Sequence, residues 1–323
     1  MANTSGNKTG STPNQDYAIP ILGRLQENDL AVIRRLRGMY VEYSQPRMAL
    51  DALADFHKIY RNSQDGACMC LVGNSGTGKS KIIQEYVTQT RRDGKLTVLA
   101  VTCPSRTSSK SILMIMLEAL RDPAPTKGTE TELERRVKLQ LELHGIEVVI
   151  IDEFQHLLDP SNHRVNMESA SWVKAQINEM RLPFVLAGLP QCETILSSCD
   201  QWNRRLSRRI ELHPFQRARQ QDTTEYLGFL KKVSDILPFA NPAFLIDGSF
   251  AARLLEVTQG RIGLIMRLIV RAAEIALVAQ NRELKLSHFS QANKELQRAE
   301  FNKYDDPFYA ARRREPPLME AAK

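Results

Sequence analysis

A glycine-rich loop that ends in lysine and serine is the clearest chemical signal in this sequence. The pattern G-x-x-x-x-G-K-S is formed by Gly73, Asn74, Ser75, Gly76, Thr77, Gly78, Lys79 and Ser80. An apolar run precedes the loop and a segment with helical spacing follows it, which is the setting that this pattern requires. The glycines allow successive backbone N–H groups to face one phosphate cluster, and the helix presents its positive end to the same anion. The loop therefore predicts a nucleoside triphosphate site.

The last residues of the loop have distinct expected roles. Lys79 would reach the β- and γ-phosphates, and the Ser80 hydroxyl would ligate Mg²⁺. Lys81, the next residue, completes the predicted binding segment. A plain glycine turn is the alternative interpretation, and the strand–loop–helix setting argues against it.

Two adjacent carboxylates, Asp152 and Glu153, follow an apolar run at residues 148–151. Such a run suits a strand covered on both faces, and ligands of open α/β sheets bind at the carboxyl edge of the strands. Asp152 would hold Mg²⁺, usually through water, and Glu153 would act as the general base. An acidic helix cap is the alternative. GTPases carry D-x-x-G at this place, so the Asp-Glu pair favours ATP over GTP.

Arginines form a third group of candidates. Four of them, Arg204, Arg205, Arg208 and Arg209, lie just before an expected short strand at 210–212. An arginine there could reach the γ-phosphate of a neighbouring subunit, although a solvated basic face or a nucleic-acid contact is also possible. Further on, Arg261 begins a helix from which it could contact the phosphates, or it is an ordinary surface residue.

Strands and helices are expected to alternate over the first two thirds of the chain. The expected strands are 67–72, 95–101, 147–151, 183–188 and 210–212, and the main helices between them are 110–120, 132–144 and 166–181. This alternation predicts an α/β fold, with a parallel sheet that is covered by helices on both faces. No comparable strand follows residue 215, where helices are expected at 222–236, 248–257, 262–279 and 287–298.

Five segments follow from these patterns. We expect a disordered N-terminal tail (1–16), a helical N-terminal extension (17–62), a nucleotide-binding α/β domain (63–215), a helical lid (216–300) and a flexible C-terminal tail (301–323). The first tail is rich in Asn, Ser, Thr and Gly, which cannot bury a core.

Composition limits the cellular setting. The 323-residue chain carries a net charge of +7, which suits either an anionic partner such as nucleic acid or a mildly basic soluble protein. It has no secretory signal at its start and no apolar run of about 18 residues, the length that crosses a membrane. Its five scattered cysteines form no C-x-x-C pair, which favours a reduced cytosol and indicates no metal site. We therefore expect a cytoplasmic protein.

Together these features resemble the AAA+ ATPases, and within them the TniB/TnsC transposition regulators, which are related to the phage Mu B protein. The resemblance covers roughly residues 19–298, and its family-level cues are D-E-F-Q-H-L-L at 152–158, V-T-C-P-S at 101–105, L-A-G-L-P at 186–190 and L-S-R-R at 206–209. It implies an ATP-dependent protein, located in the bacterial cytosol, that forms a homo-oligomer on double-stranded DNA. Such a protein selects target sites and activates a DDE transposase, with a target-selector protein as a further possible partner.

The resemblance also assigns roles to individual residues. It gives the loop at 73–80 and Asp152 to phosphate and Mg²⁺, and Glu153 to base catalysis. Arg208 best fits the arginine finger that acts on a neighbouring subunit, with Arg205 second, and Arg261 fits the lid sensor. Many relatives have Asn at the end of the fourth strand, where this chain has Ala-Gly-Leu at 187–189, so slow hydrolysis is expected.

For DNA, the resemblance indicates the loop after the second strand and the insertion that follows the next helix. The matching side chains are Arg106, Lys110, Thr126 and Lys127. Cations and hydroxyls at loop tips can bind phosphates without reading bases. Ordinary surface residues are the alternative.

Three other functions remain open. A helicase loader or replication initiator would share the fold but engage a replicative helicase. A small-molecule P-loop kinase would be monomeric and independent of DNA. A nucleotide-gated adaptor would bind proteins with negligible hydrolysis.

Overall fold

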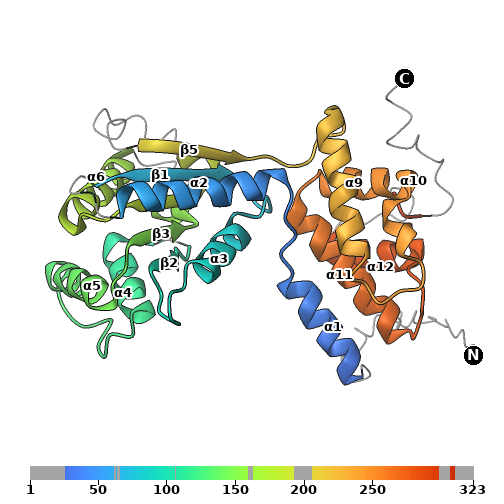
Figure 1. The fold of residues 1–323 in the computed structure, drawn as a ribbon, viewed down its shortest axis with the longest axis horizontal. Helices are drawn as coiled ribbons and strands as arrows, with labels where there is room; N and C mark the ends of the chain where they lie inside the picture. The colour runs from blue at the N-terminus through green and yellow to red at the C-terminus, as the bar shows by residue number, and fades with distance from the viewer. Residues whose placement is uncertain are drawn as a thin grey trace, which may run out of the picture.

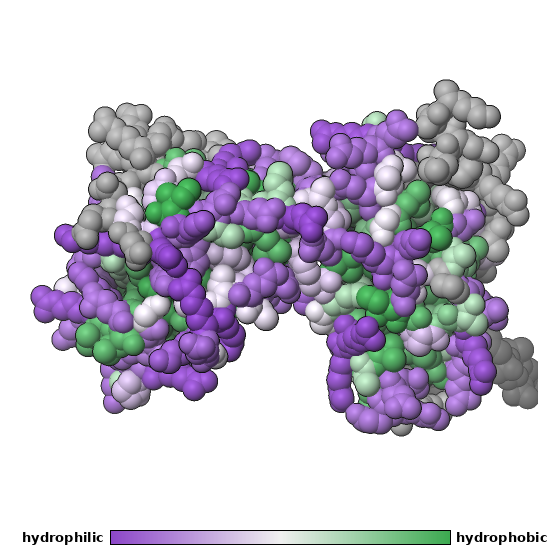
Figure 2. Space-filling view, viewed as in Figure 1, coloured by the Kyte–Doolittle hydropathy of each residue, from purple (hydrophilic) through white to green (hydrophobic). Residues whose placement is uncertain are grey.

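The computed structural model describes residues 26–61, 63, 66–105, 107–158, 163–192, 206–297 and 306–309. They form two lobes, one built around a sheet and one of helices alone (Figure 1). Figure 2 shows a notch between the lobes and hydrophilic residues over much of the visible surface. Within the described part of the chain, no helix combines the length and apolar character needed to cross a bilayer.

A five-stranded parallel sheet with the order β2-β3-β4-β1-β5 organises the first lobe. The strands are β1 (Cys68–Gly73), β2 (Val98–Thr102), β3 (Val148–Asp152), β4 (Phe184–Gly188) and β5 (Leu206–Leu212). Every residue of β1, β3 and β4 is buried, which explains their continuous apolar runs. The register pairs Val72 of β1 with Gly188 of β4 and Gly73 with Leu212 of β5, so the carboxyl ends of three strands meet at one edge.

Helices cover both faces of this sheet, as the sequence predicts. Side chains alternate along β1: Met69 and Leu71 pack with α2 (Ser44–Tyr60) and α3 (Lys79–Gln89), whereas Cys68 and Cys70 face the other layer. That second layer consists of α4 (Ser109–Ala119), α5 (Glu130–His144) and α6 (His163–Met180). The α/β fold predicted from the sequence is thus confirmed.

The helical lobe contains α9 (Gln220–Ser234), α10 (Gly248–Thr258), α11 (Ile262–Val278) and α12 (Leu286–Gln297), together with the short η3 (Pro242–Ile246). Aromatic rings fill its core, where Phe250 and Phe289 pack edge to face with their ring centroids 4.7 Å apart. The lid predicted after residue 215 is therefore present as an all-helical unit.

The expected helical extension at 17–62 does not behave as one unit. Its first helix, α1 (Glu27–Gly38), packs against α11 of the lid, where Arg37 forms a 2.5 Å ion pair with the buried Glu274 (Figure 1). Its second helix, α2, covers the sheet. The described part of the extension is helical, but the apolar face of a helix does not show in the sequence which of two cores it will join.

The expected flexible C-terminal tail also needs correction. Phe308 is buried against Phe250 and Phe289, and the Asn293 side chain donates a 3.0 Å hydrogen bond to Asp306. Residues 306–309 therefore belong to the core of the lid, because an aromatic side chain can anchor a short segment of a polar tail. The remaining tail residues, like the expected N-terminal tail at 1–16, lie outside the described residues.

Two crossings join the lobes: residues 39–43 between α1 and α2, and the segment from β5 to α9 (Figure 1). In the second crossing, the Phe215 N–H donates to the Gly260 carbonyl at 3.0 Å. Gly260 has φ +68°, and a Cβ there would lie 2.0 Å from the Phe215 oxygen. Only glycine permits this approach. Phe215 itself packs in the core of the lid. The boundary between the α/β domain and the lid, expected after residue 215, therefore lies before Phe215.

Candidate nucleotide-binding site

The glycine-rich loop lies between the end of β1 and the start of α3, as predicted. Gly76 and Gly78 have φ values of +81° and +98°, in the region that favours glycine. A Cβ on Gly73 would lie 2.7 Å from both the Leu212 carbonyl and the Thr77 hydroxyl. Since Thr77 donates a backbone and a side-chain hydrogen bond to the Asn74 carbonyl, the loop is tightly curled. Its shape fits a phosphate cradle at a helix N-terminus.

Lys79 is buried within this cradle. Its ammonium donates to the carbonyl oxygens of Gly73 at 2.7 Å and Asn74 at 3.3 Å. Burial lowers the pKa of Lys79, while the carboxylates of Glu153 and Asp152 oppose that shift. The lysine that the sequence assigns to phosphate therefore shares one electrostatic environment with the two predicted acidic residues.

Ser80 and Asp152 meet across the ends of α3 and β3. The Ser80 side chain lies beside the Asp152 carboxylate and opposes the rise in the Asp152 pKa that burial causes. A hydroxyl beside one carboxylate suits Mg²⁺, which retains waters and shares phosphate oxygens rather than filling an all-protein cage. No cluster of three or more His, Cys, Asp and Glu ligands occurs in the described residues, so the metal would depend on phosphate for further ligands.

Glu153 follows directly and adopts an unusual backbone conformation. Its φ of +55° lies in the left-handed region, where side chains other than glycine are uncommon. Its N–H donates to the Asp152 carboxylate at 2.8 Å, and its side chain accepts a hydrogen bond from the Gln155 amide. The turn into the short helix η2 (Phe154–Leu157) thus directs both carboxylates to the edge where the loop lies. The sequence did not identify Gln155 as part of the site.

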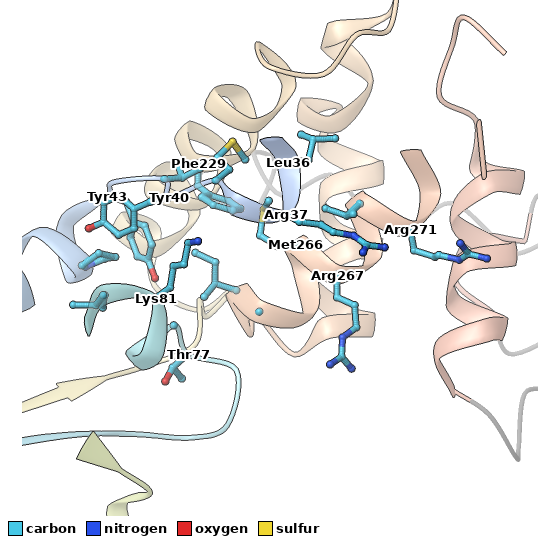
Figure 3. A pocket seen from close by; sticks show the side chains of 18 of the residues that line it. Leu36, Arg37, Tyr40, Tyr43, Thr77, Lys81, Phe229, Met266, Arg267 and Arg271 are labelled. Atoms are coloured by element: carbon cyan, nitrogen blue, oxygen red, sulfur yellow. The ribbon is translucent and has the colours of Figure 1, made fainter. Parts of the chain in front are cut away.

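A cavity of about 540 Å³ adjoins the loop between the lobes. Figure 3 shows its walls: Tyr40 and Tyr43 come from the crossing segment, Lys81 from α3, and Arg267 from α11. Much of the remaining wall is apolar, including Val41, Ile82, Ile262, Met266 and Val270. Its volume falls in the range of small-molecule sites. The sequence predicted only Thr77, Gly78 and Lys81 of this wall.

Tyr40 is the most informative residue that the sequence reasoning missed. Its hydroxyl oxygen is buried and finds no hydrogen-bond partner among the described residues. A buried hydroxyl without a partner is unfavourable, and its position on the cavity wall is suited to a polar ligand. No motif marks Tyr40, because its proximity to the loop arises only when the segment after α1 packs against the core formed by α2, α3 and the sheet.

The lid contacts the loop through the backbone of Gly263, and Arg261 lies beside the same loop residue, since a Cβ on Gly76 would come within 3.7 Å of the Arg261 Cβ. The Gly263 N–H donates to the Gly76 carbonyl at 2.8 Å, and a Cβ on Gly263 would lie 3.1 Å from that oxygen. Arg261 is the N-cap of α11, and its guanidinium donates to the Gln259 side chain at 2.9 Å. Arg267, four residues after Gly263 and so about one helical turn further, lines the cavity. The sensor role of Arg261 remains a prediction, and Arg267 is a second candidate.

Arg208 was expected just before the fifth strand. It lies instead within β5, together with Arg209. It is paired in register with Met69 and forms an exposed 3.2 Å ion pair with Asp55. Gly73 lies four residues further along β1 than Met69, a distance of about 13 Å, so Arg208 lies far from the loop of its own subunit. This position leaves a role in a neighbouring subunit as a prediction. Arg205 lies outside the described residues, as does Arg204.

Of the predicted DNA-contacting residues, the structure describes one in a helix and two on a loop. Lys110 is in the first turn of α4, and Arg106 lies outside the described residues. Thr126 and Lys127 are exposed on the loop before α5. Arg136 shapes that loop by donating to the carbonyls of Lys127 at 2.7 Å and Ala124 at 2.8 Å while it pairs with the buried Asp122. The sequence gave no sign of this bracing role.

Comparison with known families yields one match that covers more than half of the chain. A family model described as "Bacterial TniB protein" matches residues 32–217. The matched region contains the glycine-rich loop, Asp152, Glu153 and Arg208. A search of curated proteins gave no match.

Solved structures show the same fold at low sequence identity. The ORC2 protein of Aeropyrum pernix, solved as ADPNP–ADP complexes, is 16% identical with a TM-score of 0.60, covering 84% of this chain and 74% of its own. Cdc6p of Pyrobaculum aerophilum is 13% identical with a TM-score of 0.62, covering 84% of this chain and 72% of its own. The A. pernix ORC1 protein in complex with DNA is 16% identical with a TM-score of 0.57, covering 83% of this chain and 69% of its own. These similarities establish the AAA+ fold and no more.

Proposed function

The chain belongs to the TniB family of AAA+ ATPases, and from this premise we propose that it hydrolyses ATP as a DNA-bound homo-oligomer in DNA transposition. One observation carries the ATPase proposal: the buried Lys79 ammonium, held at the loop, interacts with the carboxylates of Asp152 and Glu153 at the sheet edge. The residues that we propose as metal ligands, base and phosphate-binding cation thus lie in one site.

We propose ATP as the nucleotide, with its phosphates in the loop at 73–80 and its base in the cavity between the lobes. Lys79 would exchange its carbonyl partners for phosphate oxygens, and Tyr40 would give its hydroxyl a partner on the base or the ribose. Mg²⁺, held by Ser80 and Asp152, would neutralise charge on the phosphates. The nucleotides named for A. pernix ORC2 support this assignment.

In the proposed reaction, Glu153 accepts a proton from the attacking water. Arg208 of one subunit would stabilise charge on the γ-phosphate bound by the next, since it lies about 13 Å along β1 from its own loop. Hydrolysis would then depend on assembly.

Double-stranded DNA is the proposed polyanion. Thr126 and Lys127 lie exposed on a loop that Arg136 braces, and Lys110 lies in the first turn of α4, at the opposite end of that helix from this loop. Contacts of this kind bind phosphates without sequence readout, and their repetition in an oligomer would give a steep salt dependence. The A. pernix ORC1 structure in complex with DNA supports a DNA-binding role for this fold.

The place in transposition rests on the family. We propose that the DNA-bound oligomer selects a target site and recruits or activates a DDE transposase, with a target-selector protein as a further partner. A second candidate is a replication initiator or helicase loader. One similar structure favours it: domain III of the Thermotoga maritima replication initiation protein DnaA, at 14% identity and a TM-score of 0.50. Stimulation of strand transfer by a cognate transposase, without helicase loading, would separate the two.

Phosphate release, measured with and without duplex DNA, tests the ATPase proposal. We expect slow release that duplex DNA stimulates, that needs no added acceptor, and that Lys79→Ala abolishes. Lys95→Ala is a matched control, since this exposed lysine lies in the turn before β2. Release that needs a small-molecule acceptor would favour a kinase, and ATP binding without release would favour a nucleotide-gated adaptor.

A further inference from the structure

Gln155 connects the ends of two neighbouring strands at the catalytic edge. Its side-chain oxygen accepts a 3.2 Å hydrogen bond from the Leu189 N–H just after β4, and its side-chain nitrogen donates to the Glu153 carboxylate after β3. The Leu189 N–H can only donate and an ionised Glu153 can only accept, so both partners require the same orientation of the amide. The half-buried Gln155 therefore holds Glu153 in a fixed relation to β4.

Gly188 provides the space for this arrangement. A Cβ at residue 188 would lie 2.7 Å from the Gln155 side-chain oxygen and 3.1 Å from the Cys192 sulfur. Any side chain at the end of β4 would therefore displace the amide of Gln155. The Gln155 amide can occupy this position at the end of β4 only because residue 188 is glycine.

We propose that Gln155 is a positioning residue that supplies, from η2, the amide group that this chain lacks at the end of β4. This inference rests on the ATPase function proposed above. By holding one carboxylate oxygen of Glu153, the amide leaves the other free to accept a proton from water. The left-handed backbone of Glu153 and the anchored amide together restrict the carboxylate to one direction.

Steady-state hydrolysis and ATP affinity of the full-length chain test this role. Gln155→Met keeps the approximate length and volume but removes both hydrogen bonds. We expect kcat to fall on the order of 10- to 100-fold, because a small misplacement of a catalytic group has effects of this size. The affinity for a fluorescent ATP analogue should stay within about twofold, since a group that acts on the water and not on the nucleotide should leave binding unchanged. Gln89→Met is the matched control, because Gln89 donates a similar hydrogen bond to Glu85 on the exposed surface of α3.

Two variants of Gly188 separate positioning from packing. Gly188→Ala should reproduce the loss in kcat, and adding it to Gln155→Met should cause little further loss, because both changes remove the same contact. Gly188→Asn combined with Gln155→Ala returns an amide from β4 and should recover part of kcat relative to Gln155→Ala alone. A purely structural role predicts no such recovery.

Three results would overturn the inference while leaving the proposed ATPase function in place. They are an unchanged kcat in Gln155→Met, a loss of ATP affinity in Gln155→Met as large as its loss in kcat, and no recovery of kcat when Gly188→Asn is added to Gln155→Ala. A wild-type protein that binds ATP but never releases phosphate would overturn both.

Discussion

At the scale of residues, the site contains two kinds of side chain. Some can be identified from their spacing along the sequence, and others come close to the loop only when the chain folds. Lys79, Ser80, Asp152 and Glu153 belong to the first kind, because a phosphate loop and a strand end each place their side chains by backbone geometry alone. The structure brings these four together.

Glu153→Gln should bind ATP but hydrolyse it on the order of 10²- to 10⁴-fold more slowly, since loss of a general base has effects of this size. Assemblies on DNA should persist as a result. Phosphate release and binding of a fluorescent ATP analogue measure the two properties separately. Glu142→Gln, an exposed change on α5, serves as the control. Unchanged turnover in Glu153→Gln would remove this residue as the base.

Tyr40→Phe deletes only the hydroxyl that lies buried on the cavity wall. If the nucleotide gives that hydroxyl its partner, ATP affinity should fall about tenfold, which corresponds to the loss of one hydrogen bond of about 1.4 kcal/mol. Titration with a fluorescent ATP analogue measures this change, and Tyr60→Phe in α2 is the control. Equal affinity in Tyr40→Phe would place the base elsewhere.

At the scale of elements, the edge strand β5 (Leu206–Leu212) differs most from expectation, because a strand was expected only at 210–212. The sequence placed the arginines before a short strand, but β5 begins at Leu206 and includes Arg208. The polar residues Ser207, Arg208 and Arg209 gave no strand signal, because an edge strand needs apolar side chains only where it faces the core. Pairing with β1 forms the strand in spite of that composition.

Arg208→Ala should reduce turnover while leaving ATP binding intact, because the guanidinium lies far from its own loop. Mixing it with Lys79→Ala should restore part of the activity: the Lys79→Ala subunits supply the finger, and the Arg208→Ala subunits supply a working loop. Phosphate release from a series of mixing ratios measures the rescue. Intact assembly without rescue would favour a basic surface role for Arg208.

At the scale of the whole molecule, two lobes and the cavity between them could be predicted only in part. Alternating strands and helices followed by helices alone predicted both lobes, because hydrophobic periodicity is a local property. The attachment of α1 to the lid, the packing of Phe308 and the cavity with Tyr40 depend on contacts between distant segments. The proposed role of Gln155 also depends on a contact between distant segments, because its amide fits only beside a glycine at residue 188.

The most direct test of the account is electron microscopy of the full-length protein on duplex DNA, with and without ATP and Mg²⁺, beside Lys79→Ala and Glu153→Gln. We predict ordered assemblies of the wild type only with ATP, none with Lys79→Ala, and longer-lived ones with Glu153→Gln. Equal assembly without nucleotide, or normal assembly of Lys79→Ala, would contradict the claim that ATP binding at this loop controls assembly on DNA.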